Sequence, residues 1–279
     1  MVEHGLTQAV FSAEVARALS ERAGAAGRRV EVHVKVDTGM GRLGLKPEEL
    51  IPFLETLRGM DGIRVGGLLT HLAYADGSDP GFMAGQAELL NSLRSAAGDI
   101  GFTDLICHCG NSSSVANFPR LHMDMVRAGI MLYGVPPATG MDGHLDLRPA
   151  MSWVSRVAHL QDWEEGTSIS YNRTFRTNRK SRIATVPIGY SRGYSGFLSN
   201  RGKLLIRGRL APVVGKVCMD MSMADVTEVG EVAVGDEVVA MGRQGEQVIS
   251  AQDIAEAFGG SPYEILCLAG KCNPRVYID

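Results

Sequence analysis

The hydrophobic positions of the first half of the chain alternate between two periods. Short apolar runs suit buried strands, and stretches with helical spacing separate them. The pattern predicts strands over 6–11, 30–37, 65–71 and 104–109, a last strand within 123–133, and helices over 12–25, 47–59, 82–97 and 113–118. Ser12 is the expected N-cap of the first helix. Repeated strand–helix units of roughly 30 residues predict a parallel sheet, either an open doubly wound sheet or a barrel.

The pattern changes near Pro149. Short β-rich runs follow at 153–160, 182–188, 203–206, 211–217 and 237–240, with one helix at 251–258. We therefore expect a mainly β domain after the α/β one. The predicted domains are 1–138 and 139–279, joined by a linker near Pro136, Pro137 and 140–144.

Composition excludes several classes of protein. The chain has 279 residues, 45% of them hydrophobic and 21% charged, which is typical of a soluble globular protein. A net charge of −3 offers no basic surface for nucleic acid. No apolar run approaches the ~20 residues of a membrane span, and the N-terminus lacks the pattern of a secretory signal. Five cysteines, an odd number, favour reduced thiols and a cytoplasmic location.

The run Cys107, His108, Cys109 raises the question of a metal site. Alternation along a strand sends the two cysteines to one face and the histidine to the other. A second Cys/His pair at zinc-like spacing does not accompany them in the sequence. We expect core cysteines and no metal.

The candidate functional residues follow the predicted strands in the sequence. Lys35 and Arg42 flank a turn with three glycines within six residues, Gly39 to Gly44. An arginine delivered by such a turn suits a planar anion, such as a carboxylate or a phenolate. The residues alone allow a glycine-rich connector with a surface arginine equally well. His71 also follows a strand, where it is either functional or a satisfied core histidine.

A second group follows the later strands. Asn111 and Ser112, with the run 127–130, can present a hydroxyl and backbone N–H groups to a phosphate, as loops at the end of a barrel do. The alternative is that Ser112 caps the short helix that follows. The two readings are compatible, because both use the same unpaired N–H groups.

Eight segments together resemble alanine racemases along the whole chain. In order, they are KVDTGMGRLG at 35–44, THLAYAD at 70–76, HCGNSS at 108–113, VRAGIMLYG at 126–134, ISYNRTF at 169–175, IGYSRGY at 188–194, VGKVCMDM at 214–221, and PYEIL with NPRVYI at 262–278. The resemblance implies a (β/α)8 barrel, a β-rich C-terminal domain and pyridoxal 5′-phosphate as cofactor. It also implies interconversion of L- and D-alanine for cell-wall precursors by a homodimer with shared active sites.

The resemblance also implies roles for particular residues. Tyr171 is the acid/base that a partner subunit supplies, although its position alone favours an aromatic residue packed in the β domain. His71 contacts that tyrosine, and Arg127 lies behind the histidine and faces the pyridine nitrogen of the cofactor. Arg42 is implied to contact the phenolic oxygen of the cofactor and the substrate carboxylate, and Lys35 corresponds to a lysine that is often carbamylated in the family. Met219 is implied to line the substrate pocket and Tyr190 its entrance. The residues implied at the phosphate are Ser112, Gly129 and Ile130, beside Asn111.

The chain departs from the family in its first part. The family's Schiff-base lysine lies in a motif like V-K-A-N-A-Y-G-H, which the sequence lacks. Aligned by motif, the chain starts near the fourth barrel strand, so about five of the eight strands are expected. We therefore expect an N-terminally truncated racemase with little or no activity alone. The alternatives are a non-catalytic or complementing subunit that lends Tyr171, and a related decarboxylase, which the Tyr171 motif argues against.

Overall fold

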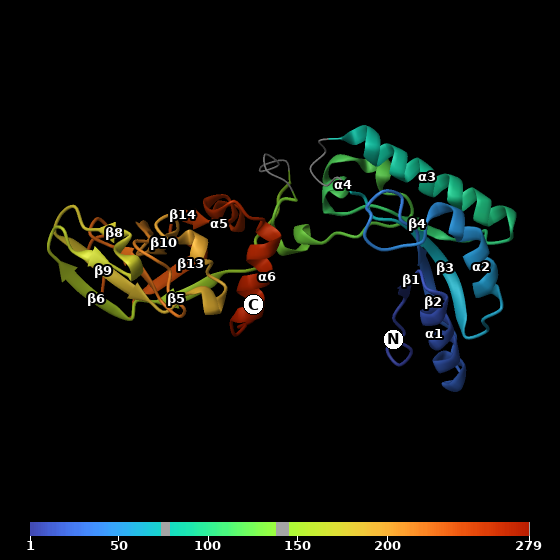
Figure 1. The fold of residues 1–279 in the computed structure, drawn as a ribbon, viewed down its shortest axis with the longest axis horizontal. Helices are drawn as coiled ribbons and strands as arrows, with labels where there is room; N and C mark the ends of the chain where they lie inside the picture. The colour runs from blue at the N-terminus through green and yellow to red at the C-terminus, as the bar shows by residue number, and fades with distance from the viewer. Residues whose placement is uncertain (74–78, 138–144, 279) are drawn as a thin grey trace. The chain divides into compact units, whose positions relative to one another are not determined.

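The computed structural model describes residues 1–73, 79–137 and 145–278 (Figure 1). The chain forms two compact units, one built mainly from residues 1–132 and the other mainly from 147–279. The expected boundary between 138 and 139, and the linker segment 140–144, lie outside the described residues.

The first unit is built on a parallel sheet, as the strand–helix pattern predicts. Its strands are β1 (Gln8–Val10), β2 (Val30–Lys35), β3 (Ile63–Leu69) and β4 (Ile106–His108), in the spatial order β1-β2-β3-β4. Sequential order with helical crossovers is typical of barrel-type α/β folds. All four strands end at the same edge, where the candidate residues follow.

Helices cover one face of this sheet. They are α1 (Ala13–Ala25), α2 (Leu50–Arg58), which follows the 3-10 turn η1 (Pro47–Glu49), and α3 (Pro80–Asp99). The short helix α4 (Ser112–Asn117) follows β4. Ser12 caps α1, as expected, by accepting a hydrogen bond from the backbone N–H of Val15. The alternate residues Val30, Val32 and Val34 are buried in one core with the first three helices. By the same alternation, Glu31, His33 and Lys35 lie on the opposite face.

The strand expected over 123–133 does not form. Val126 makes only an isolated bridge to Gly110, and the 3-10 helix η3 (Ile130–Tyr133) follows. The backbone explains the difference. The N–H of Arg127 reaches the carbonyl oxygen of Gly110, whereas that of Gly129 donates to a serine side chain, so the ladder cannot continue.

The second unit is mainly β, as expected. Its five-stranded sheet joins β11 (Arg209–Pro212), β10 (Lys203–Ile206), β13 (Glu237–Gln244), β14 (Gln247–Ile249) and β5 (Trp153–Arg156). A second sheet joins β12 (Ser222–Asp225), β9 (Ser181–Val186) and β6 (His159–Trp163), and β7 (Ser168–Ile169) pairs with β8 (Phe175–Arg176). The helices are α5 (Ala251–Phe258) and α6 (Pro262–Cys272), and the short 3-10 segments are η4 (Tyr171–Arg173), η5 (Tyr190–Arg192) and η6 (Gly196–Leu198). A further 3-10 segment, η2 (Pro119–Leu121), belongs to the first unit.

Three expectations for this unit need correction. The run 153–160 forms two strands, because the chain leaves β5 at Val157 and starts β6 at His159. The strand expected over 211–217 ends at Pro212, because proline donates no ladder bond and Gly215 has a φ of +77°. Helix α6 was not predicted, although Ser261 and Pro262 form a regular helix start.

Within the part of the chain that the structure describes, a search for helices long and apolar enough to cross a membrane finds none. Cys107 and Cys109 are fully buried, and the thiol of Cys109 contacts the carbonyl oxygen of Leu121. They pack in the core, as the alternation of the strand predicts.

Candidate active site

The glycine turn after β2 is held by its own aspartate. The carboxylate of Asp37 accepts hydrogen bonds from the backbone N–H groups of Gly39 and Arg42, both at 2.9 Å. Burial alone would raise the pKa of Asp37, but these bonds and those from Gly41 and Met40 hold it below its usual value. The turn also needs Gly44, whose φ is +135° and whose missing Cβ would lie 2.6 Å from the backbone nitrogen of Asp37. The turn therefore presents Arg42 from a fixed backbone.

Gln86 on α3 connects the loops that follow β2 and β3. Its side-chain nitrogen donates to the hydroxyl of Thr38 and the carbonyl oxygen of His71, both at 3.3 Å, and its side-chain oxygen accepts from the N–H of Ala73 at 2.9 Å. Thr38 in turn meets Thr70 at 2.8 Å between hydroxyl oxygens. Sequence reasoning missed Gln86, which is 2% exposed. The available signal was an amide side chain on the buried face of an amphipathic helix.

Lys35 and His71 each lie within electrostatic range of Arg42 and Arg127, and His71 also lies within range of Lys35. Burial, followed by Arg42 and Arg127, lowers the pKa of Lys35, and Asp37 partly offsets this. Burial, followed by Arg127, Arg42 and Lys35, lowers the pKa of His71. The structure thus brings together four residues singled out from the sequence. Their shared positive potential favours an anionic ligand and a neutral His71.

The guanidinium of Arg127 is held by neutral groups. It donates to the carbonyl oxygen of Thr70 at 2.8 Å, to that of His108 at 3.2 Å and to that of Cys109 at 3.4 Å, and it also meets the Nδ1 atom of His108. Carbonyl and imidazole acceptors fix the position of the guanidinium without neutralising its charge.

The segment after β4 turns toward the loop that carries Gly129. The hydroxyl of Ser112 accepts a hydrogen bond from the N–H of Gly129 at 2.7 Å. Asn111, and not Ser112, caps α4, because its side-chain oxygen accepts from the N–H of Ser114. The hydroxyl of Ser113 is buried and has no hydrogen-bond partner in the described chain. Ile130 is buried at the start of η3.

Tyr171 lies on a tightly constrained turn of the second unit. Its side chain is 70% exposed, so it is not a packed residue of the β domain. The preceding Ser170 has φ 65° and ψ −176°, a conformation that is almost restricted to glycine, and Asn172 also has a positive φ. Such backbone strain tends to persist where a side chain must be held in one place.

Met219 and Tyr190 lie on loops that hydrogen-bond to each other. The N–H of Tyr190 donates to the carbonyl oxygen of Cys218 at 3.1 Å, and the N–H of Ser191 donates to that of Met219 at 2.9 Å. The side chains of Met219 and Tyr190 are 56% and 51% exposed. Ser170 joins this group through the same segment, since its hydroxyl donates to the carbonyl oxygen of Lys216 at 2.7 Å.

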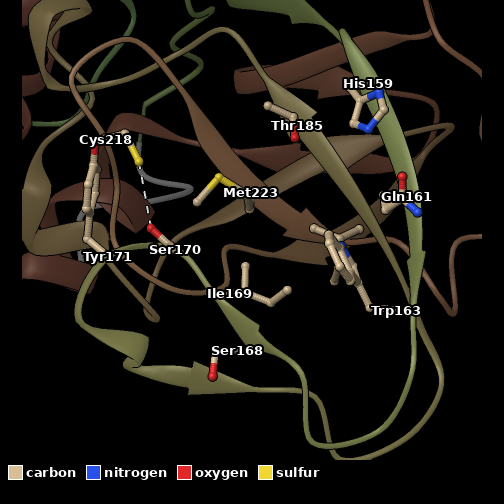
Figure 2. Close-up of a pocket in the computed structure, with 11 residues that line it drawn as sticks. His159, Gln161, Trp163, Ser168, Ile169, Ser170, Tyr171, Thr185, Cys218 and Met223 are labelled. Atoms are coloured by element: carbon tan, nitrogen blue, oxygen red, sulfur yellow. Dashed lines mark hydrogen bonds between the residues drawn. The ribbon is translucent and has the colours of Figure 1, made fainter.

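A cavity of about 390 Å³ lies beside Tyr171. Figure 2 shows Tyr171, Ser170 and Cys218 at one end of it, with the Ser170–Cys218 contact drawn, and the side chains of β6 at the other. The sequence analysis did not foresee this cavity. In each unit, then, the candidate residues gather on neighbouring loops.

The sequence matches two family models over nearly its whole length. Residues 1–137 match the alanine racemase N-terminal domain, and residues 150–277 match the alanine racemase C-terminal domain. The chain is 42% identical to the alanine racemase of Halothermothrix orenii over 277 residues, which cover 99% of the chain and 73% of that protein. It is 40% identical to that of Desulfovibrio desulfuricans over 279 residues, 100% of the chain and 74% of that protein.

Solved structures agree with the sequence matches. The alanine racemase from D-cycloserine-producing Streptomyces lavendulae superposes with a TM-score of 0.92 at 28% identity, covering 100% of the chain and 74% of that structure. The alanine racemase of Bacillus anthracis, with bound L-Ala-P, gives a TM-score of 0.85 at 33% identity and covers 96% of the chain and 69% of that structure. The chain therefore belongs to the alanine racemase family.

Proposed function

We propose that the protein interconverts L- and D-alanine and so supplies D-alanine for cell-wall precursors. Enzymes of the alanine racemase family depend on pyridoxal 5′-phosphate. The observation that carries the proposal is the meeting of two arginines, a lysine with a lowered pKa and a neutral histidine after the parallel strands. An anionic cofactor and an amino-acid carboxylate are the ligands that such a site favours.

The described residues fit the phosphate and the ring nitrogen of this cofactor, whereas the motif of the family's Schiff-base lysine is absent from the sequence. Ser113, the residue after Ser112, has a buried hydroxyl without a partner in the described chain, and phosphate oxygens can accept from such groups. Ser112, Gly129 and Ile130, beside Asn111, would hold the phosphate, and Arg127 would face the ring nitrogen. When bound, the cofactor withdraws the electron pair that is released at the substrate Cα.

The cationic residues bind and orient the reactants. Arg42 reaches a planar anion, either the phenolic oxygen of the cofactor or the substrate carboxylate, with its forked donors. Lys35 with its lowered pKa is unprotonated more often than an ordinary lysine, which suits reaction with carbon dioxide. The amine nitrogen forms the bond to carbon and releases one proton to solvent, which leaves a carbamate. The carbamate anion would orient Arg42. Arg127 keeps a permanent charge, because its hydrogen bonds in the described chain go to neutral carbonyl oxygens and an imidazole ring.

Tyr171 and His71 move a proton on one face of the substrate. A phenol holds its proton near pH 7 unless a neighbour accepts a hydrogen bond from it. His71 is suited to that task, because its lowered pKa keeps the imidazole neutral. Since Tyr171, Met219 and Tyr190 belong to the second unit, we propose that a second copy of the chain supplies them in a homodimer. Met219 would line the carboxylate pocket and Tyr190 its entrance.

We propose further details of the fold, the location and the activity. Four parallel strands in sequential order support a (β/α)8 barrel to which this chain contributes a part, with domains 1–138 and 139–279. A cytoplasmic location suits reduced cysteines. The named relatives are racemases, so they lend no support to an impaired enzyme or a non-catalytic subunit.

The test is formation of D-alanine from L-alanine by purified protein with added pyridoxal 5′-phosphate. Tyr171→Phe should lower the rate by about 100-fold or more, because it removes the proton of an acid/base group. Tyr277→Phe, at a side chain that is 87% exposed near the C-terminus, is the matched control and should keep the wild-type rate. Equal rates for wild type and Tyr171→Phe would contradict the proposal.

A further inference from the structure

A continuous line of polar side chains crosses the first sheet on the face opposite its helices. Arg127 meets the Nδ1 atom of His108, whose Nε2 atom lies 2.7 Å from the Nδ1 atom of His33. The Nε2 atom of His33 lies 3.3 Å from the Oε1 atom of Glu31, and the Oε2 atom of Glu31 meets Arg64. The line begins at the half-buried Arg127, passes through a buried histidine pair and ends at Arg64, whose side chain is 57% exposed.

The chemistry of the end groups fixes the direction of every bond in this line. A guanidinium can only donate, so the Nδ1 atom of His108 is an acceptor and its ring hydrogen is on Nε2. That hydrogen is donated to the Nδ1 atom of His33. His33 must then carry its own ring hydrogen on Nε2, where it meets an acceptor, the carboxylate of Glu31. Both histidines are thereby held in one tautomer.

Both imidazoles are also kept neutral. Burial, and then Arg127 and His33, lowers the pKa of His108 to about 4. Burial lowers the pKa of His33 as well. A proton added to the Nδ1 atom of His108 would point at the N–H of Arg127, so the line has a single arrangement at neutral pH. Along this line, Arg127 is therefore connected to the carboxylate of Glu31 only through the neutral rings of His108 and His33.

Two glycines make room for the line. The residue opposite His33 on β3 is Gly67, and a Cβ there would lie 2.7 Å from the His33 ring. A register shift leaves Gly66 as an extra residue, and a Cβ there would lie 2.4 Å from the Glu31 side chain. Any larger residue at these positions would displace His33 or Glu31 from its partner.

We propose that Glu31 and His33 are positioning residues for Arg127. Acting through His108, they fix the tautomer that accepts from the guanidinium and hence the direction in which the remaining N–H groups point. For the task of Arg127 at the cofactor ring, the inference rests on the proposed function. The hydrogen-bond line itself does not depend on that function.

The experiment observes the ring nitrogens directly. Full-length protein labelled with ¹⁵N-histidine is studied by long-range ¹H–¹⁵N correlation at pH 7, without cofactor, and the signals are assigned with His33→Leu and His108→Leu. We expect the Nε2–H tautomer for both rings. Glu31→Leu should shift the His108 nitrogens, although the two side chains do not touch, and Glu31→Gln, which retains an acceptor oxygen, should largely restore them. Glu21→Leu, an exposed position on α1, is the matched control.

Gly67→Ala is a second variant that should disturb the histidine pair, and it removes no hydrogen-bonding group. It should change the His33 and His108 signals, whereas Gly98→Ala, where a Cβ meets nothing within 4 Å, should not. An Nδ1–H tautomer at His108, or His108 signals that ignore Glu31→Leu, would overturn the inference.

Steady-state kinetics of the protein with bound cofactor provide an independent test. His33→Leu should lower kcat roughly 10-fold or more with little change in KM for alanine, since a misplaced Arg127 affects the reaction more than substrate binding. Unchanged kcat would overturn the positioning role. If wild-type protein does not racemise alanine, the proposed function fails, and the NMR comparison still decides whether the line exists.

Discussion

Ser170 donates its hydroxyl to the carbonyl oxygen of Lys216 at 2.7 Å, and this bond ties the turn that carries Tyr171 to the loop that carries Met219. The two loops also meet at Gly215, whose missing Cβ would lie 2.6 Å from that of Ser170. Two segments separated by more than forty positions in the sequence, 170 and 216, thus hold one another in place.

Two substitutions at Ser170 distinguish the cost of its backbone conformation from the contribution of its hydrogen bond. Ser170→Ala keeps the Cβ in a glycine-like conformation and loses the hydroxyl, whereas Ser170→Gly loses both. We expect Ser170→Gly to be more stable than Ser170→Ala by about 1–3 kcal/mol, the cost of such a backbone conformation. Urea unfolding of the two variants measures the difference. Equal stability, or a more stable alanine variant, would show that the turn is not strained.

Gln86→Leu should destabilise the first unit by about 1–3 kcal/mol, because it leaves several polar groups of the two loops without their buried partner. It should also raise KM for alanine, since His71 then loses its tie to α3. Thermal unfolding and steady-state kinetics report the two effects. Gln247→Leu, at an exposed position of β14, is the comparison and should change neither.

Acid should destabilise the folded protein through His108. Burial, Arg127 and His33 lower its folded pKa to about 4, whereas an unfolded histidine titrates near 6.5. Between these values the unfolded chain binds the extra proton, so stability falls as pH decreases from about 6.5 to about 4, by at most ~1.4 kcal/mol per pH unit. His108→Gln should flatten this slope in urea unfolding followed against pH. His4→Gln, at an exposed position, should leave it as steep as in wild type.

A pair of glycine substitutions should act in opposite directions. Gly85 lies at an exposed position inside α3 with nothing within 4 Å of an added Cβ, so Gly85→Ala should stabilise the first unit by about 0.5–1 kcal/mol. Gly44→Ala should destabilise it, since the added Cβ meets backbone atoms at 2.6 and 2.9 Å. The midpoints of thermal unfolding test both signs, and a destabilised Gly85→Ala would contradict the helix argument.

The sequence predicted the elements that local signals define. Helix 251–258 and strand 203–206 agree with the structure at both ends, because capping and turn residues bound them. The strand expected over 123–133 failed, since its backbone donors are taken by groups distant in the sequence. Pairing of that kind is a tertiary effect that an apolar pattern does not encode.

The residues of the candidate site likewise fall into those that the sequence could predict and those that depend on tertiary contacts. Lys35, Arg42, His71 and Arg127 could be grouped from the sequence, because parallel strands end at one edge. Gln86 and the pair His33 and His108 could not. Their importance depends on which polar groups become buried opposite one another, and only the folded arrangement decides that.

The aspartate in the glycine turn has a consequence for ligand binding. Because the Asp37 carboxylate already bonds the backbone N–H groups of its own loop, that loop is ordered before any anion arrives. The free energy of binding the anion is then not reduced by the loss of conformational entropy that ordering a flexible loop would cost. The loop works as a rigid receptor whose shape the protein supplies in advance.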